Sequence, residues 1–107
     1  MTVKEFLATT VHYHISCCGT MVQDVRKRLC CNDGYSVSVQ ADEDCYCDPR
    51  LNGYQDYNSV ELGYPSAEDE LINEYAQDES DYTGTVYGWV PIEVVEKLIE
   101  KHGGIKE

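Results

Sequence analysis

The distribution of charge along the chain is the feature that most limits how it can fold. Residues 41–82 hold thirteen of the twenty acidic residues and a single basic one, Arg50, so this stretch carries a charge equal to the whole net charge of −12. Six of the nine tyrosines lie in the same stretch. The two ends are nearly neutral and show clearer hydrophobic patterning. We therefore expect an acidic, tyrosine-rich surface in the middle of the chain, between two better-patterned ends.

Length and composition indicate a small folded protein. At 107 residues we expect one domain, residues 1–107, with an acidic loop and helix segment at 42–82. The apolar residues are mostly Val, Tyr and Cys, which favours a small, strand-rich core. No run approaches the roughly 18 apolar residues of a membrane span, and the first residues lack the apolar core of a signal peptide. These features predict a cytosolic protein that does not associate with membranes.

The N-terminal third predicts a helix followed by strands. Thr2 and Glu5 have the spacing of a capping box, which predicts a short helix over about residues 3–9. Alternation over residues 11–17 predicts a strand. Its expected core-facing residues are Val11, Tyr13, Ile15 and Cys17, and its expected outward residues are His12, His14 and Ser16. Residues 20–31 fit either an amphipathic helix or the return strand of a hairpin that turns at 19–20, and the hairpin is slightly favoured because a short strand needs a nearby partner.

The central part alternates between clear and weak patterns. Asn32-Asp33-Gly34 is a strong turn signal, and residues 35–41 then alternate as a strand with Tyr35, Val37 and Val39 on one face. Residues 42–64 read as a long irregular loop. Ser66 is expected to cap a short acidic helix over roughly 67–77. Its inner face would be Leu71, Ile72, Tyr75 and Ala76, and its outer face Glu68, Asp69, Glu70 and Glu74.

The C-terminal part completes the predicted fold. Residues 85–90 read as a final strand, and Pro91 suits the first position of a helix over about 92–102. That helix carries an apolar stripe of Ile92, Val95, Leu98 and Ile99, and Gly103-Gly104 end it. The predicted fold class is α+β: a small, mostly antiparallel sheet with two or three short helices and the C-terminal helix packed on the sheet.

Six cysteines raise the alternative of a metal site. They stand at positions 17, 18, 30, 31, 45 and 47, and His12 and His14 lie nearby in sequence. A small zinc-stabilised interaction module is therefore one hypothesis. Adjacent pairs and a Cys-x-Cys do not match the Cys-x2-Cys spacing of zinc knuckles. Free thiols, some buried and some exposed, are the favoured interpretation, and we predict no metal and no cofactor.

Catalysis and direct nucleic-acid binding are disfavoured. The chain has no phosphate-binding glycine loop, no His-Glu-x-x-His and no Gly-x-Ser-x-Gly. The acidic residues fit no EF-hand loop, so at most weak divalent-ion binding is expected from them. The cluster Arg26-Lys27-Arg28 is short and reads as a solvated face, while the net charge opposes a phosphate backbone. We predict a protein that is neither an enzyme nor a nucleic-acid binder.

The acidic surface has two interpretations: its charge only prevents aggregation and has no partner, or it binds a basic protein partner. The second interpretation is slightly favoured. Carboxylates pair with arginine, tyrosines supply rigid contact area, and regularly spaced acids imitate the phosphates of duplex DNA. The expected partner is the basic DNA-binding groove of a host nuclease or another DNA-binding protein. The predicted contact residues are Asp42, Glu43, Asp44, Asp48, Tyr54, Asp56, Tyr57, Tyr64, Glu68, Asp69, Glu70, Glu74, Asp78, Glu79, Asp81 and Tyr82.

The start of the chain and its overall character carry a resemblance. Met1-Thr2-Val3-Lys4-Glu5-Phe6-Leu7, followed by a strand, resembles the start of many small proteins of phages and mobile elements of Gram-positive bacteria. Small size, strong acidity and tyrosine richness resemble the anti-CRISPR proteins, several of which occupy the DNA-binding groove of an RNA-guided nuclease. The resemblance implies a non-enzymatic DNA mimic in the bacterial cytoplasm that blocks the DNA- and PAM-binding groove of such a nuclease.

Overall fold

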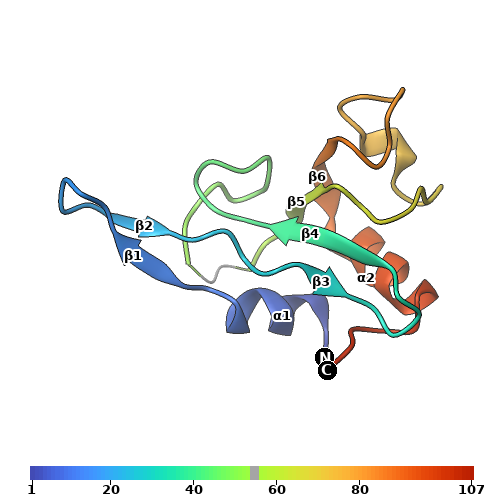
Figure 1. The fold of residues 1–107 in the computed structure, drawn as a ribbon, viewed down its shortest axis with the longest axis horizontal. Coiled ribbons are helices and arrows are strands. Elements are labelled where there is room, and N and C mark those ends of the chain that lie inside the picture. Colours follow the sequence, from blue (N-terminus) through green and yellow to red (C-terminus); the bar gives the residue numbers. More distant parts are fainter. Residues whose placement is uncertain (54–55) are drawn as a thin grey trace.

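The computed structural model describes residues 1–53 and 56–107 and shows an α+β fold, as predicted (Figure 1). Its elements in chain order are α1 (Val3–Thr9), β1 (Tyr13–Ile15), β2 (Met21–Gln23), β3 (Leu29–Cys30), β4 (Ser36–Gln40), β5 (Ser59–Gly63), the 3-10 helix η1 (Asn73–Tyr75), β6 (Val86–Pro91) and α2 (Ile92–Lys101). Strands β3, β4, β5 and β6 form one antiparallel sheet in that order, and β1 and β2 form a separate hairpin. Neither α-helix of the described residues has the length and apolar character needed to cross a membrane.

The two α-helices form where local signals predicted them. The Thr2 side chain and the Glu5 side chain make both hydrogen bonds of the capping box at the start of α1. In α2 the predicted apolar stripe of Ile92, Val95, Leu98 and Ile99 is buried. The helix follows β6 directly, packs against it and also contacts α1. These local patterns therefore predicted both helices correctly.

The core lies between α1, α2 and the four-stranded sheet. From β4 it receives Val37 and Val39, and from β5 it receives Val60 and Leu62. The predicted turn at 32–34 is present, and Tyr35 is buried as the alternation of that strand required. The C-terminal helix therefore packs against a sheet whose inner face is mostly Val and Leu.

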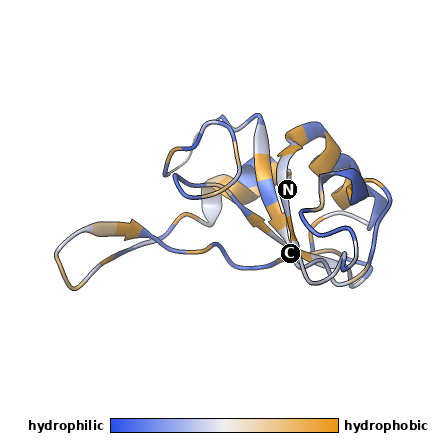
Figure 2. Cartoon of the chain, turned by 90° about the horizontal axis from the view of Figure 1, so that it is seen from above, coloured by the Kyte–Doolittle hydropathy of each residue, from blue (hydrophilic) through white to orange (hydrophobic). Residues whose placement is uncertain are grey.

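The hairpin is confirmed, but its predicted core face is wrong. Strand β1 pairs with β2, which excludes a helix over 20–31. All three β1 residues are exposed, and Ile15 and Met21 remain 69% and 64% exposed. Figures 1 and 2 show the reason: the hairpin extends away from the rest of the chain, and of the residues in β1 and β2 only Gln23 at its base is buried. The predicted return strand is also interrupted, because β2 ends at Gln23 and β3 begins only at Leu29.

The middle of the chain departs most from the prediction. The expected loop over 42–64 contains β5, an inner strand of the sheet. The expected helix over 67–77 is absent, and only the single turn η1 forms there. Ser66 caps no helix, because its hydroxyl accepts the backbone N–H of Ser36 at 2.9 Å and its own N–H donates to the Ser36 carbonyl at 2.8 Å. Ser66 therefore extends the pairing of β4 instead of starting a helix.

Candidate protein-interaction surface

The acidic stretch forms two irregular segments, and both are attached to strand β6. We call residues 41–58 the first acidic segment and residues 64–85 the second. The Trp89 N–H donates to the Tyr46 carbonyl at 2.9 Å, and the Gln77 N–H donates to the Val86 carbonyl at 3.0 Å. A Cβ atom at Gly88 would lie 3.2 Å from both Gln77 Nε2 and Tyr46 Cβ. The two segments therefore meet at Gly88, in strand β6.

A buried arginine holds the first acidic segment. Arg26 is only 2% exposed, and its guanidinium donates to the carbonyls of Leu7 (3.3 Å), Ala41 (2.6 Å) and Gly53 (3.3 Å). Gln23 adds a bond to Ala41 and accepts the Gly53 N–H at 2.6 Å. The interpretation of residues 26–28 as a solvated face is therefore wrong for Arg26, which satisfies backbone carbonyls that water does not reach.

Tyr57 belongs to the same buried network. Its side chain is buried, and its hydroxyl lies 2.6 Å from the Leu51 carbonyl oxygen and 3.0 Å from that of Gly53. Burial raises the pKa of this hydroxyl. The prediction that Tyr57 contacts a partner is therefore wrong, because the ring supports the loop from inside.

A charged cluster holds the second acidic segment. Its central residue, Asp69, has a side chain that is 2% exposed. One carboxylate oxygen lies 2.9 Å from His102 Nε2 and 3.1 Å from Lys101 Nζ, and the other accepts the Leu71 N–H at 3.0 Å. His102 also bonds Asp33 through Nδ1 at 2.7 Å. We call Asp33, Asp69, Lys101 and His102 the His102 clasp.

The clasp changes the pKa of Asp69 and of His102. Burial alone raises the pKa of Asp69, but the bonds from Leu71, His102 and Lys101 outweigh it and lower that pKa below its usual value. Burial lowers the pKa of His102, whereas the bonds and charges of Asp33 and Asp69 outweigh it and raise that pKa, which favours the protonated imidazole. The prediction that Asp69 faces solvent on a helix is wrong, because its side chain is buried and no α-helix forms there.

Most of the other predicted contact residues are exposed. The exposed acids are Glu43, Asp44, Asp48, Asp56, Glu68, Glu70, Glu74, Asp78, Glu79 and Asp81, and Asp42 is half-buried. Tyr64 is exposed and Tyr82 is half-buried, while Tyr54 lies outside the described residues. Some of these acids also organise their own loop, since Asp42 accepts the Asp44 N–H and Asp78 accepts the Ser80 N–H. The two segments thus present carboxylates from backbone that is held in place.

Two exposed aromatic residues that the sequence did not single out lie where the first acidic segment meets β6: Tyr46 of that segment and Trp89 of β6. Tyr46 and Trp89 stack with ring centroids 4.9 Å apart and an interplanar angle of 26°. Their residues remain 38% and 49% exposed. The Arg50 guanidinium lies over the Tyr46 ring, 5.9 Å from its centroid. We call Tyr46 and Trp89 the aromatic platform.

A β-bulge exposes Trp89. Val60 pairs with Val90 and Leu62 with Tyr87, so β6 has one residue more than β5 between these pairs. This extra residue lets Tyr87 and Val90 both face the core although they are three positions apart. Trp89 accommodates the extra residue of β6 with a backbone φ of 49°, a conformation that residues with bulky side chains rarely adopt. Gly88 within a predicted strand was the sequence signal for this bulge.

The cysteines do not form a cluster. Cys17, Cys18 and Cys30 are exposed, whereas Cys31, Cys45 and Cys47 are buried. Burial raises the pKa of Cys31 to about 11 and also raises that of Cys45 and Cys47. In residues 1–53 and 56–107, no group of three or more His, Cys, Asp or Glu side chains is arranged to hold a metal ion.

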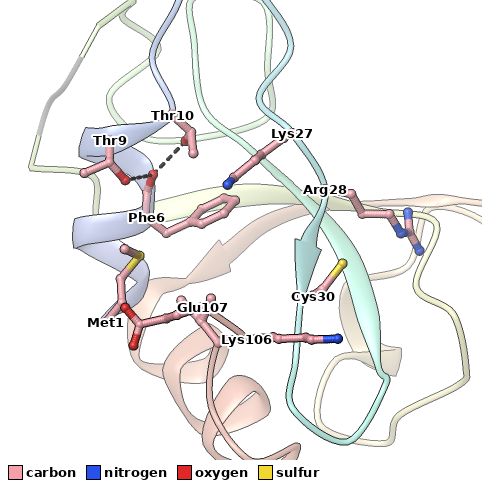
Figure 3. A pocket seen from close by; sticks show the side chains of 10 residues that line it. Met1, Phe6, Thr9, Thr10, Lys27, Arg28, Cys30, Lys106 and Glu107 are labelled. Carbon is pink, nitrogen blue, oxygen red and sulfur yellow. Dashed lines mark hydrogen bonds between the residues drawn. The ribbon is translucent and has the colours of Figure 1, made fainter.

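A cavity of about 490 Å³ lies near the chain ends (Figure 3). Met1, Phe6, Lys27, Lys106 and Glu107 are among its lining residues. The hydroxyls of Thr9 and Thr10 there both donate to the Phe6 carbonyl. Arg28 points away from the cavity and bonds Ser36 and the Tyr64 carbonyl. The side chains of Thr9, Thr10 and Arg28 thus bond groups of the fold, and the cavity shares no lining residue with the acidic segments.

No protein-family model, no curated protein and no solved structure matches this chain. A function is therefore inferred from the residues of the chain alone.

Proposed function

We propose that the protein is a non-enzymatic inhibitor that occupies the basic DNA-binding groove of a nucleic-acid-binding defence protein. An RNA-guided DNA nuclease in the bacterial cytoplasm is the first target to test. One observation carries the proposal: the exposed carboxylates belong to two fixed segments that meet at strand β6, with exposed aromatic rings between them. Such a surface has the charge of a nucleic acid and the anchor residues of a protein interface.

Fixed carboxylates are what distinguish a DNA mimic from a merely acidic tail. A groove that binds DNA aligns Lys and Arg along its walls, and it gains most from anions that are already in position. The Arg26 network and the His102 clasp immobilise the two segments without consuming most of their exposed acids. Asp69 and Tyr57 are excluded from the contact set, because both are buried.

A competition assay tests the proposal directly. Purified protein is titrated into guide-loaded nucleases with labelled target DNA at about 50 and about 300 mM salt, which brackets the screening range. We expect loss of DNA binding at near-stoichiometric inhibitor, with weaker inhibition at the higher salt concentration. Inhibition that does not depend on salt would contradict charge mimicry. Absence of inhibition for every nuclease tested, with the protein folded, would contradict the choice of target.

Matched variants identify the surface. Glu43→Gln/Glu79→Gln removes one exposed carboxylate from each acidic segment, and Glu100→Gln/Glu107→Gln removes two exposed carboxylates near the C-terminal end. Both double variants change the net charge equally. We expect only the first pair to weaken inhibition, by about three- to tenfold. Equal weakening by both pairs would mean that total charge matters and the proposed surface does not.

A further inference from the structure

The aromatic platform has the properties of a binding site for one particular cation. We propose that Tyr46 and Trp89 bind an arginine guanidinium of the partner in preference to a lysine ammonium. This inference rests on the proposed function, since it names the side chain that the acidic surface receives. A guanidinium is planar and stacks on aromatic faces, whereas an ammonium is a compact, strongly hydrated point charge.

The exposure of the aromatic platform is accompanied by an unfavourable backbone conformation at Trp89. A tryptophan at a φ of 49° is strained, and half of the residue still faces solvent. Its N–H bond to the Tyr46 carbonyl and the close contact of Gly88 with Tyr46 keep the two rings together. The bulge lets Tyr87 and Val90 fill the core, but that packing does not require an aromatic side chain at position 89, which faces solvent. Strain at an exposed aromatic residue indicates a binding role.

Arg50 shows how the platform receives a guanidinium. It is the single basic residue of the stretch 41–82, and its guanidinium lies over the Tyr46 ring. The Glu61 carboxylate accepts the backbone N–H of Tyr46 at 3.4 Å, so a negative charge lies beside the backbone of this residue. A partner's arginine would meet the same combination of ring face and carboxylate. Arg50 is then an internal competitor that the partner's side chain displaces.

Two peptides of equal charge test the preference. Fluorescein-labelled oligo-arginine and oligo-lysine peptides of the same length are titrated with the wild-type protein, and anisotropy gives both affinities. We expect the arginine peptide to bind about three- to fivefold tighter. Trp89 is the only tryptophan of the chain, so its fluorescence should change with the unlabelled arginine peptide and much less with the lysine peptide.

Three variants assign the preference to the platform. Trp89→Gly keeps a residue that accepts the positive φ, and it should reduce the arginine-to-lysine affinity ratio about threefold without lowering the melting temperature. Tyr13→Ala removes an exposed aromatic residue of β1, outside the two acidic segments, and should leave the ratio unchanged. Arg50→Gln should increase the arginine-to-lysine affinity ratio, because it removes the internal competitor for the platform. If only charge mattered, the variant would raise the affinity for both peptides equally and the ratio would not change.

The outcomes separate this inference from the proposed function. An unchanged ratio in Trp89→Gly, or a ratio lost in Tyr13→Ala and retained in Trp89→Gly, would overturn the arginine site while leaving nuclease inhibition intact. A ratio that depends on Trp89, without inhibition of any nuclease, would keep the arginine site and overturn the proposed target. If Trp89→Gly fails to fold, Arg50→Gln and the wild-type fluorescence decide the question, since Arg50 is exposed.

Discussion

The two acidic segments look alike in sequence and are held by opposite means. The first is built around a buried cation, Arg26, whose guanidinium donates to backbone carbonyls. The second is built around a buried anion, Asp69, which accepts bonds from His102, Lys101 and a backbone N–H. Where the backbone of a small domain is irregular, side chains must bond the buried N–H and C=O groups that no sheet pairs. Here the cation Arg26 does so in the first segment and the anion Asp69 in the second.

This difference has a functional consequence. The groups that hold the first segment, Arg26, Gln23 and Tyr57, include neither an imidazole nor a carboxylate. The second segment depends on an imidazole and two carboxylates, which titrate under milder conditions. The first segment should therefore be a permanent part of the surface, and the second should respond to pH.

Removal of the buried cation is expected to have the largest effect. Arg26→Met fills a similar volume but leaves the carbonyls of Leu7, Ala41 and Gly53 without their donors. We expect a loss of about 3 kcal/mol or more in the free energy of unfolding, measured by urea denaturation. Lys27→Met, at the exposed neighbouring position, is the matched control and should change stability little. Equal losses in the two variants would show that the network contributes nothing specific.

Replacement of the buried anion, Asp69, should lower the free energy of unfolding by less than replacement of Arg26 does. Asp69→Asn keeps the shape of the side chain but removes the charge that pairs with His102 and Lys101. Lys101 is half-exposed, so solvent already weakens its share. We expect the free energy of unfolding to fall by about 2 kcal/mol. The loss of hydrogen-exchange protection should be concentrated in residues 64–85. Glu70→Gln is the exposed control next in sequence. Loss of protection that spreads evenly over both acidic segments would contradict separate anchoring.

The smallest expected effect is a pH dependence confined to the second segment. His102 has a folded pKa above its usual 6.5, so its contribution is complete below pH 6.5 and is lost as pH rises through the raised value. Asp33 and Asp69 have folded pKa values below the usual 3.8. Their contribution is present above 3.8 and is lost as pH falls through the lowered values. The clasp is therefore strongest between about pH 4 and 6.5.

Protection factors at about pH 6 and pH 8.5 measure this effect. We expect residues 64–85 to lose protection at the higher pH, while residues 41–53 keep theirs. The groups facing His102 are Asp33 from the turn before β4, Tyr35, whose ring stacks on the imidazole at 3.9 Å, and Asp69. His102→Gln should abolish the difference between the two pH values. A persistent difference in that variant would assign the titration to another group.

Elements specified by neighbouring residues were predictable from the sequence. The capping box of Thr2 and Glu5 and the stripe of α2 involve residues within a few positions of one another. The alternation of β4 was equally legible, because its core face is Tyr35, Val37 and Val39. The α+β class follows from these elements alone.

The errors all concern partners distant in sequence. Ser66 has the chemistry of a helix cap, yet its partner is Ser36, thirty positions earlier. Asp69 reads as an acid in the first turn of a helix, but its partner His102 stands 33 positions later. The alternation of β1 indicated a buried face, and no element was available to cover it. Apart from Asp69, the exposure of the second-segment acids was predicted correctly. The exposure of Trp89 could not be predicted, because it depends on the register of β6 against β5.

The way the last residues close the sheet has a consequence for synthesis on the ribosome. The Lys106 N–H donates to the Cys30 carbonyl at 2.8 Å, Ile105 pairs with Cys31, and the Val3 N–H donates to Glu96 at 3.0 Å. The outer edge of β3 and the start of α1 therefore cannot make these contacts until residues 96–106 have left the ribosomal exit tunnel. Until then the nascent chain carries an open strand edge beside an exposed apolar hairpin, which is the state in which such a chain is most exposed to misassembly and to chaperones.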